Sequence, residues 1–333
     1  MNINLFYLSD ARYGGHVTFT VHLMLGLRAV GASASLYKVG KNTEDKWRDF
    51  GYGRLYQNIS LVDACRLCKS KRSVTLVVAT NKPCAQAINA MIDAGARAVI
   101  HDPGEFKRGW NWQKVQRPIV IRESMLSWFE DAVFLLHPYD PLFGKIFVAP
   151  TEEWAAVSTS RIDFDKHTEI LLDANRLLDK KDRIQIYGFE NRIYTRFNVV
   201  PKYPEWRQSV CKYPRKLRYA VRQLCHKAAF SCDMSIIKGD GGGTQYTFLE
   251  AIDAGCALVL NRGWIIDNHV MNPDSNCFAV SDGEQLAGLI KEYTRGSKIM
   301  RRRVERRRIK ARRLLDKHLA RKVAVSWKEE LHD

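Results

Sequence analysis

The stretch from Gly241 to Leu260, GGGTQYTFLEAIDAGCALVL, decides the fold class. Three consecutive glycines predict a loop, and the helical pattern that follows, Thr247 to Ala254, ends at Gly255. An apolar run from Ala257 to Leu260 then predicts a strand, and another, Met234 to Ile237, precedes the loop. A strand, a glycine loop, a helix and a second strand in this order indicate a parallel sheet.

The same alternation extends in both directions from this stretch. In the second half we expect strands at Glu153–Ser158, Arg183–Tyr187 and Val199–Val200, and helices at Lys166–Leu178 and Lys216–Lys227. In the first half we expect strands at Asn2–Leu8, Ala34–Val39, Ser73–Ala79, Ala98–Ile100, Ile119–Arg122 and Val133–Leu136, and helices at Val17–Ala29 and Cys84–Ala94.

The alternation restarts near Pro150. We therefore predict an α/β protein with two Rossmann-like domains, residues 1–149 and 150–333, whose strand-end loops face a central cleft. The last thirty residues predict a basic amphipathic helix with Ala311, Leu315 and Leu319 on its apolar stripe, which could return to the first domain.

The charge of the chain is strongly positive. Lys and Arg number 53 against 36 Asp and Glu, which gives a net charge of +17, although 46% hydrophobic residues exclude a disordered chain. Fifteen basic and three acidic residues lie between Lys291 and Lys322, and a second basic cluster includes Arg215 and Lys216. This clustering indicates a polyanionic partner, either nucleic acid or an anionic membrane surface; the alternative is a solvated helix face.

The cysteines and the N-terminus indicate a reducing compartment. Only Cys65 and Cys68, of eight cysteines, have C-x-x-C spacing, so we expect free thiols and no metal site. No apolar run approaches the ~18 residues of a membrane-spanning helix, and the first residues lack the features of a secretory signal. We expect a monomer in the cytoplasm, or in the host cytoplasm if the protein is viral.

Three strand ends carry residues that suit an anionic ligand. Gly14 and Gly15 follow the first strand and would let backbone N–H groups approach an anion, although such glycines are often only structural. Arg161 ends a strand and Lys166 follows it at a helix start, where the two charges could clamp a diphosphate. Glu250, on the helix after the triple glycine, could hold two vicinal hydroxyls or merely complement the helix dipole.

Together these features resemble the large family of retaining GT-B glycosyltransferases. The strand-end Arg161 with Lys166 five residues on, and the glycine loop followed by Leu249-Glu250-Ala251 and an apolar strand, are similar to the motifs of that family. Residues 232–237 are similar to its preceding strand, and residues 13–16 to its N-terminal glycine loop. The resemblance covers most of the chain and implies a GT-B fold.

The resemblance implies a nucleoside diphosphate sugar as co-substrate, with a UDP-sugar favoured, and no tightly bound cofactor. Arg161 and Lys166 would neutralise the leaving diphosphate in place of a metal, and Glu250 would bind the ribose. Gly243, Thr244 and Gln245 would place backbone amides near the phosphate and the sugar. Where the family has a second Glu, this sequence has Gly242, which leaves the sugar and the anomeric outcome open.

For the acceptor, a carboxylate or histidine is needed to activate a hydroxyl. Asp102 ends a strand in His101-Asp102-Pro103-Gly104-Glu105, with His101 and Glu105 as further candidates. Phage DNA glucosyltransferases resemble this segment, with an aromatic stretch, here Trp110 and Trp112, after the strand-end Asp.

With the net charge, this resemblance favours duplex DNA carrying a hydroxymethylated base as acceptor, reached by base flipping. The candidate DNA-binding residues are Trp110, Trp112, Arg215, Lys216, Arg301, Arg302, Arg306 and Arg307.

Two alternatives remain. Related transferases act at membranes on lipid-linked or lipopolysaccharide acceptors, and the arginines from Arg301 to Arg313 would then face anionic lipid. A non-enzymatic nucleic-acid binder on the same scaffold would explain the charge, but not the combination of Arg161, Lys166 and Glu250.

Overall fold

The protein forms two compact α/β units. The computed structural model describes residues 2–8, 15–39, 55–70, 73–79, 85–101, 109–141, 149–211, 220–236, 243–265 and 270–332. The first unit holds Met1–Asp140 and Lys317–Asp333, and the second holds most of the chain between them. Each unit is built on a parallel sheet, which confirms the predicted α/β class.

The sheet of the first unit has the order β3-β2-β1-β4-β5-β6-β7, with every pair of neighbours parallel. Its strands are β1 (Asn2–Leu8), β2 (Ser33–Val39), β3 (Tyr56–Ile59), β4 (Ser73–Ala79), β5 (Arg97–Ile100), β6 (Ile119–Val120) and β7 (Val133–Phe134). Leu5 of β1 pairs with Leu36 on one side and Leu76 on the other. Because helices cover both faces of such a sheet, its central strands need the near-continuous apolar runs found here.

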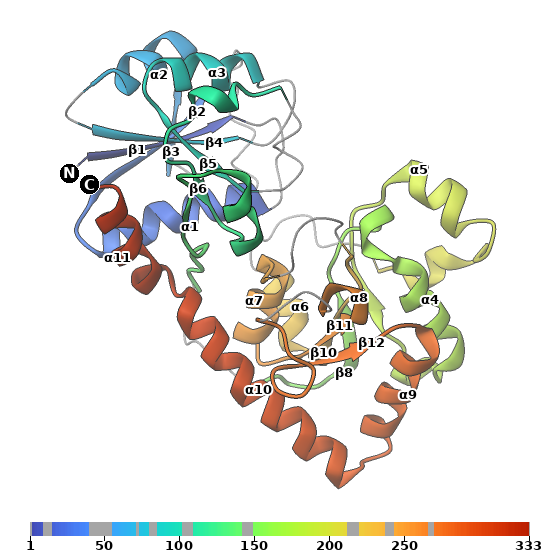
Figure 1. Cartoon of the computed structure of the whole chain (residues 1–333). Coiled ribbons are helices and arrows are strands. Elements are labelled where there is room, and N and C mark those ends of the chain that lie inside the picture. The colour runs from blue at the N-terminus through green and yellow to red at the C-terminus, as the bar shows by residue number, and fades with distance from the viewer. Residues whose placement is uncertain are drawn as a thin grey trace. The chain divides into compact units, whose positions relative to one another are not determined.

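Helices cover both faces of this sheet, α1 (Gly15–Ala29) and α11 (Ala320–Glu330) on one side and α2 (Leu61–Cys68) and α3 (Ala85–Asp93) on the other (Figure 1). Two short 3₁₀ helices, Trp112–Lys114 and Glu123–Trp128, follow β5 and β6. Helix α11 is held by the fully buried Trp327, whose Nε1 donates to the Leu136 carbonyl at 3.0 Å. The C-terminal helix is thus part of the core of this unit.

The predicted basic C-terminal helix is two helices, α10 (Lys298–His318) and α11. The break lies at Leu319, which bridges to Tyr139. The Tyr139 amide donates to the His318 carbonyl at 2.6 Å, and the Ala320 amide donates to the Tyr139 carbonyl at 2.8 Å. Leu319, expected on the apolar stripe of a single helix, therefore separates the two helices and is the N-cap residue of the second.

The sheet of the second unit has the order β12-β11-β10-β8-β9 and is also parallel throughout. Its strands are β8 (Trp154–Ser158), β9 (Gln185–Ile186), β10 (Ala228–Asp233), β11 (Ala257–Asn261) and β12 (Cys277–Val280). Its helices are α4 (Thr168–Leu177), α5 (Arg192–Tyr194), α6 (Ala220–His226), α7 (Tyr246–Asp253), α8 (Arg262–Ile265), α9 (Gly283–Thr294) and most of α10.

The main core of the second unit lies where α4, α9 and the start of α10 pack on the sheet. Phe230 of β10 sits at its centre, with its ring centroid 5.0 Å from that of Tyr293 and 5.8 Å from that of Phe278. Helices α6 and α7 lie on the opposite face (Figure 1). This packing holds the strands rigidly and leaves their carboxyl ends to carry polar loops.

Two predicted strands of this unit are wrong. Val199 ends a π-helical turn, Thr195–Val199, and is not in a strand. The strand expected at Met234 to Ile237 lies earlier, as β10, because pairing with β11 stops at Asp233; Ile237 lies outside the described residues. In the part of the chain that the structure describes, no helix combines the length and apolarity that a membrane crossing requires.

Candidate active site

The strand order of the second unit reverses direction between β8 and β10. From β8 the chain crosses to β9 on one side and then to β10 on the other. The loops after β8 and β10 therefore diverge, and open α/β sheets bind their ligands in the crevice at this point. Arg161 and Lys166, predicted to bind the donor, follow β8 and so lie after a strand at this reversal point.

Lys166 has an ammonium group buried in this loop. It closes a short 3₁₀ helix, Phe164–Lys166, which Asp163 caps by accepting from the Phe164 amide at 2.9 Å. The side chain is 9% exposed, and Nζ donates to Ser235 Oγ at 2.7 Å and to Gln245 Oε1 at 3.4 Å. The ammonium also lies 3.9 Å from Asp165 Oδ2, which is too long for a strong hydrogen bond. A buried cation whose short contacts are to neutral acceptors can still bind an anionic ligand.

Arg161 lies in different surroundings, because its side chain is 60% exposed. Its guanidinium contacts Asp163 Oδ2 at 3.0 Å and Asp165 Oδ2 at 3.5 Å. Exposed ion pairs of this kind contribute little to stability, so the guanidinium can exchange a carboxylate for a phosphate at small cost.

A close backbone approach fixes the shape of the loop around Arg161. A Cβ on Gly188 would lie 2.2 Å from the Ser160 carbonyl oxygen, so the chain leaving β9 needs glycine there. The Ile162 amide donates to the Phe189 carbonyl at 2.9 Å, and the Asn191 amide donates to the Ile162 carbonyl at 2.9 Å. These bonds align the loops after β8 and β9 side by side.

The predicted glycine loop leads into α7 within the described residues from Gly243 onward. Gly243 has a φ of +92°, a conformation that favours glycine. Thr244 is buried, and Gln245 is the N-cap of α7 without a side-chain cap bond. The Gln245 Nε2 group is buried and has no hydrogen-bond partner among the described residues, so a ligand could satisfy it. Glu250 is half-buried further along α7.

Asp233, at the end of β10, joins these loops and was not singled out by the sequence. Its carboxylate accepts from Ser160 Oγ at 2.5 Å, from the Ser235 amide at 3.0 Å, from Ser235 Oγ and from Thr247 Oγ1 at 3.2 Å. Burial alone would raise the pKa of Asp233, but the Lys166 ammonium and the bonds from Ser160 and Ser235 together lower it. An Asp that ends a buried strand with Ser two residues later was the available sequence signal.

Several predicted site residues fall outside the described part of the chain. These are Gly14, Asp102, Glu105, Arg215 and Lys216, as well as the side chain of Trp112. Gly15 begins α1. His101 follows β5 and is buried, with its ring centroid 4.2 Å from that of His16 and 5.5 Å from that of Phe19.

Trp110 belongs to the core of the first unit. Its side chain is buried in the cluster that includes Ile88, Met91 and Val115. Trp110, predicted to bind DNA, therefore lies among core side chains.

The predicted DNA-binding arginines of α10 lie in different environments. Arg302 and Arg306 are exposed, and Arg301 stacks over Tyr293 with Cζ 5.5 Å from the ring centroid. Arg307 is half-buried, and its guanidinium covers the Phe278 ring. Its Nε donates to the Cys277 carbonyl at 2.7 Å, and its Nη2 donates to the Pro273 carbonyl at 2.6 Å. Arg307 therefore fastens α10 to the loop before β12.

Buried histidines gather in the first unit. The His318 and His137 ring centroids are 4.5 Å apart, and His318 Nδ1 lies 2.9 Å from the His137 carbonyl oxygen. Burial lowers the pKa of His318 to about 4, with Arg122 and Lys317 acting in the same direction. Burial, followed by the charges of His318 and Arg122, holds the pKa of His137 well below its ordinary value. Both rings are therefore neutral near pH 7.

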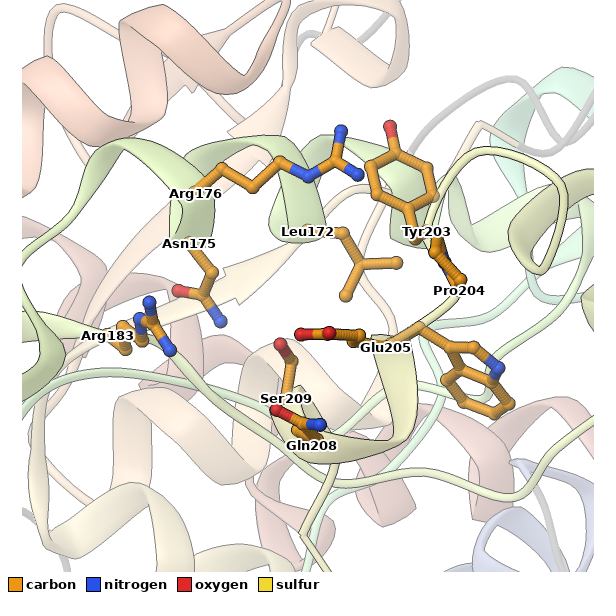
Figure 2. Close-up of a pocket in the computed structure, with 10 residues that line it drawn as sticks. Leu172, Asn175, Arg176, Arg183, Tyr203, Pro204, Glu205, Gln208 and Ser209 are labelled. Carbon is orange, nitrogen blue, oxygen red and sulfur yellow. The ribbon is translucent and has the colours of Figure 1, made fainter.

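A separate pocket of about 210 Å³ lies beside α4 (Figure 2). Asn175 lines it, but its amide is committed to the backbone of Ile184, just before β9. Arg176 donates to the Lys202 carbonyl at 2.7 Å and stacks on Tyr203. The pocket lies at the amino end of β9, whereas the candidate site is at the carboxyl ends of the strands. Among the described residues, no group of three or more His, Cys, Asp or Glu side chains is placed to hold a metal.

Comparison with known proteins identifies the fold. No protein-family model and no curated protein matches the sequence. An alpha-glucosyltransferase in complex with UDP-glucose and DNA containing an abasic site matches over 100% of both chains, with 12% identity and a TM-score of 0.74. The same kind of enzyme with UDP and a 13-mer DNA containing an HMU base matches over 99% of both chains, with 13% identity and a TM-score of 0.76.

A third match is Anabaena Alr3699/HepE in complex with UDP and glucose, with 12% identity, a TM-score of 0.72 and 99% of both chains covered. At these identities the similarity concerns the fold. The chain has the two-unit GT-B glycosyltransferase fold, as the sequence motifs predicted.

Proposed function

We propose that the protein transfers a sugar from a nucleoside diphosphate sugar, with UDP-glucose as the first choice, to a hydroxyl group. The buried ammonium of Lys166 beside the exposed guanidinium of Arg161, at the reversal point of the second sheet, carries this proposal. Two positive charges at this crevice suit a diphosphate leaving group. Glu250 would bind the ribose, and Gly243, Thr244 and Gln245 would approach the phosphates and the sugar.

For the acceptor we propose a hydroxymethylated base in duplex DNA. The net charge of +17 and the exposed arginines of α10 support a polyanionic partner. The alpha-glucosyltransferase of the same fold has been solved with DNA. We assign Asp102 as the base that activates the hydroxyl, with His101 and Glu105 as the next candidates.

The test is transfer of labelled glucose from UDP-glucose to matched duplexes with and without a hydroxymethylated base. A panel with GDP-sugars in place of UDP-glucose identifies the donor. Labelling of the modified duplex alone is expected. Absence of nucleotide release with every donor would contradict the transferase assignment itself.

Asp102→Asn is expected to reduce transfer severely with little change in donor affinity, because the base acts only in the transition state. Its turnover with modified DNA is compared with that of the wild type and of Glu105→Gln. Turnover within a few-fold of wild type would move the role to His101 or Glu105.

A membrane acceptor is the second candidate, and an exposed apolar cluster favours it. Ile193 lies on α5, Phe197 on the π-helix after it, and Val200 directly follows that helix; their exposed fractions are 64%, 66% and 45%. The guanidinium of Arg196 lies 5.4 Å from the Phe197 ring centroid. Apolar side chains beside arginines are typical of surfaces that enter an anionic bilayer. Transfer to a lipid acceptor in anionic vesicles, with none to modified DNA, would select this candidate.

A further inference from the structure

Asp233 connects the ends of three elements around the candidate site. Ser160 follows β8, Ser235 follows β10, and Thr247 lies in the first turn of α7. All three hydroxyls donate to the same carboxylate, which is 5% exposed. A buried carboxylate that accepts only hydroxyl and amide donors needs a cation nearby to offset its charge.

That cation is Lys166, which reaches the carboxylate through Ser235. Lys166 Nζ donates to Ser235 Oγ at 2.7 Å, and Ser235 Oγ in turn donates its proton to Asp233. A hydroxyl that has given its proton to a carboxylate can only accept from a third group. The carboxylate therefore fixes the direction of the whole chain of hydrogen bonds.

We propose that Asp233 is a positioning residue for donor binding, which acts by holding Ser235 as an acceptor and so fixing the Lys166 ammonium toward the diphosphate. The proposal rests on the proposed function, because it needs Lys166 to bind the diphosphate. Asp233 itself does not touch the ligand. Its effect passes through Ser235 and Lys166, and this makes it measurable as a coupling between residues.

The test is a double-mutant cycle on UDP affinity with Asp233→Asn, Lys166→Met and the double variant, measured by calorimetry. The side-chain amide introduced by Asp233→Asn would turn a donor toward one of the hydroxyls, so the chain to Lys166 would break. We expect UDP to bind about 10-fold or more weakly in D233N, the loss typical of a charged hydrogen bond. In the K166M background the same change should cost less than about 3-fold, because no ammonium remains to be positioned.

Uridine provides a second readout, because it lacks the diphosphate. Uridine affinity should be nearly the same in wild type and D233N, whereas general disruption of the site would weaken uridine and UDP alike. Ser235→Ala interrupts the chain at its middle and should reproduce the pattern if D233N folds poorly. The matched control is Ser231→Ala, which removes a buried hydroxyl from the same strand, where its neighbour is Cys225 Sγ at 4.0 Å.

Equal losses of UDP affinity in the wild-type and K166M backgrounds would overturn the proposal, and so would a parallel loss of uridine affinity. Failure of the proposed function is a separate outcome. In that case the wild-type protein itself would show no UDP binding, whereas failure of the positioning role leaves wild-type binding intact and removes only the coupling.

Discussion

Lys166 and Arg161 carry the same charge in opposite surroundings, and this difference predicts unequal roles. Lys166 is buried, hydrogen-bonded to Ser235 and 3.9 Å from Asp165, whereas Arg161 is exposed and paired with two aspartates. An ammonium in a low-dielectric site interacts more strongly with a phosphate than an exposed guanidinium does.

We expect Lys166→Met to weaken UDP binding by about 10- to 150-fold, the range for a charged hydrogen bond, and Arg161→Ala to weaken it less. Calorimetry with UDP measures both. Lys180→Met, an exposed lysine of the same unit, is the matched control and should bind as the wild type does. Unchanged affinity in both site variants would remove the diphosphate assignment.

His318 predicts how stability depends on pH. Its folded-state pKa of about 4 lies below the ordinary value of 6.5, so the unfolded state takes up a proton first as the pH falls. Stability should therefore decline from about pH 6.5 to about pH 4, by about 3 kcal/mol for this group, and then stop changing. His137 acts in the same direction.

His318→Asn can keep the donor to the His137 carbonyl but cannot be protonated, so it should flatten this decline. Urea unfolding at pH 7, 5.5 and 4 measures the effect, with the exposed His332→Asn as control. Parallel pH profiles for wild type and His318→Asn would contradict the assignment.

The residues of the donor site differ in how visible they are in the sequence. Arg161 and Lys166 could be predicted because charged residues at a strand end and a helix start form a local pattern. Asp233 was less visible, since Ser235 two residues later was its one local signal, and its other partners Ser160 and Thr247, 73 and 14 residues away in sequence, meet it only in the fold. Trp110 shows the same limit, because nothing local distinguishes a core tryptophan from a surface one.

At the scale of elements, the alternation of apolar strands with helices could be predicted from the sequence, but the residues at which the elements end could not. Apolar residues lie on both sides of Asp233, so periodicity could not show where β10 stops. The break between α10 and α11 was also invisible, because it depends on hydrogen bonds with Tyr139, distant in sequence. Tertiary pairing decided both boundaries.

The close packing of α1 against α11 predicts a sharp contrast between two helical glycines. A Cβ on Gly26 would lie 2.6 Å from the Ala320 carbonyl oxygen, whereas a Cβ on Gly288 of α9 would meet nothing within 4 Å. Gly26→Ala should therefore destabilise the protein by about 1–3 kcal/mol, since backbone must move. Gly288→Ala should be neutral or stabilise by about 0.5–1 kcal/mol, because alanine loses less backbone entropy in a helix.

Denaturant unfolding of the two variants checks this contrast. The probe is the near-UV signal of the aromatic residues, which include the buried Trp327 on α11. Equal stability of Gly26→Ala and Gly288→Ala would mean that the two helices can separate at little cost.

At the scale of the whole molecule, some arginines of α10 are bonded to the protein itself, and others are exposed and could contact a ligand. Arg308 donates to Glu152 Oε1 at 2.9 Å and to the Ala229 carbonyl at 3.1 Å, and with Arg307 it holds α10 to the second unit. Neutralising Arg307 or Arg308 should unfold α10 locally, so a resulting loss of DNA affinity would not identify a DNA contact. The available charges form an exposed stripe on the same helix, with no hydrogen bond or ion pair to other described residues: Arg302, Arg306, Lys310 and Arg313.

The spacing of this stripe places its four charges on one face of α10 over three turns, where they could follow a line of phosphates. Each phosphate contact with duplex DNA contributes about −0.9 to the slope of log K against log salt. Changing all four residues to Gln should therefore flatten the slope by about 3 to 4 if all four contact phosphates, and UDP affinity should stay unchanged. Fluorescence anisotropy with a labelled duplex over a salt series measures the slope.

A variant that loses the same charge outside α10 shows whether DNA affinity depends on the position of the positive charges or on the net charge of the protein. Lys69, Lys180, Lys181 and Arg183 are exposed and lie outside α10, and their change to Gln lowers the net charge equally. If the stripe binds DNA, only the α10 variant should lose slope, because counterion release depends on contacts rather than on net charge. Equal changes of the salt slope in both variants would mean that DNA is attracted by the net charge of the protein rather than by the stripe. If the α10 variant loses binding to anionic vesicles but not to DNA, the stripe binds a membrane instead.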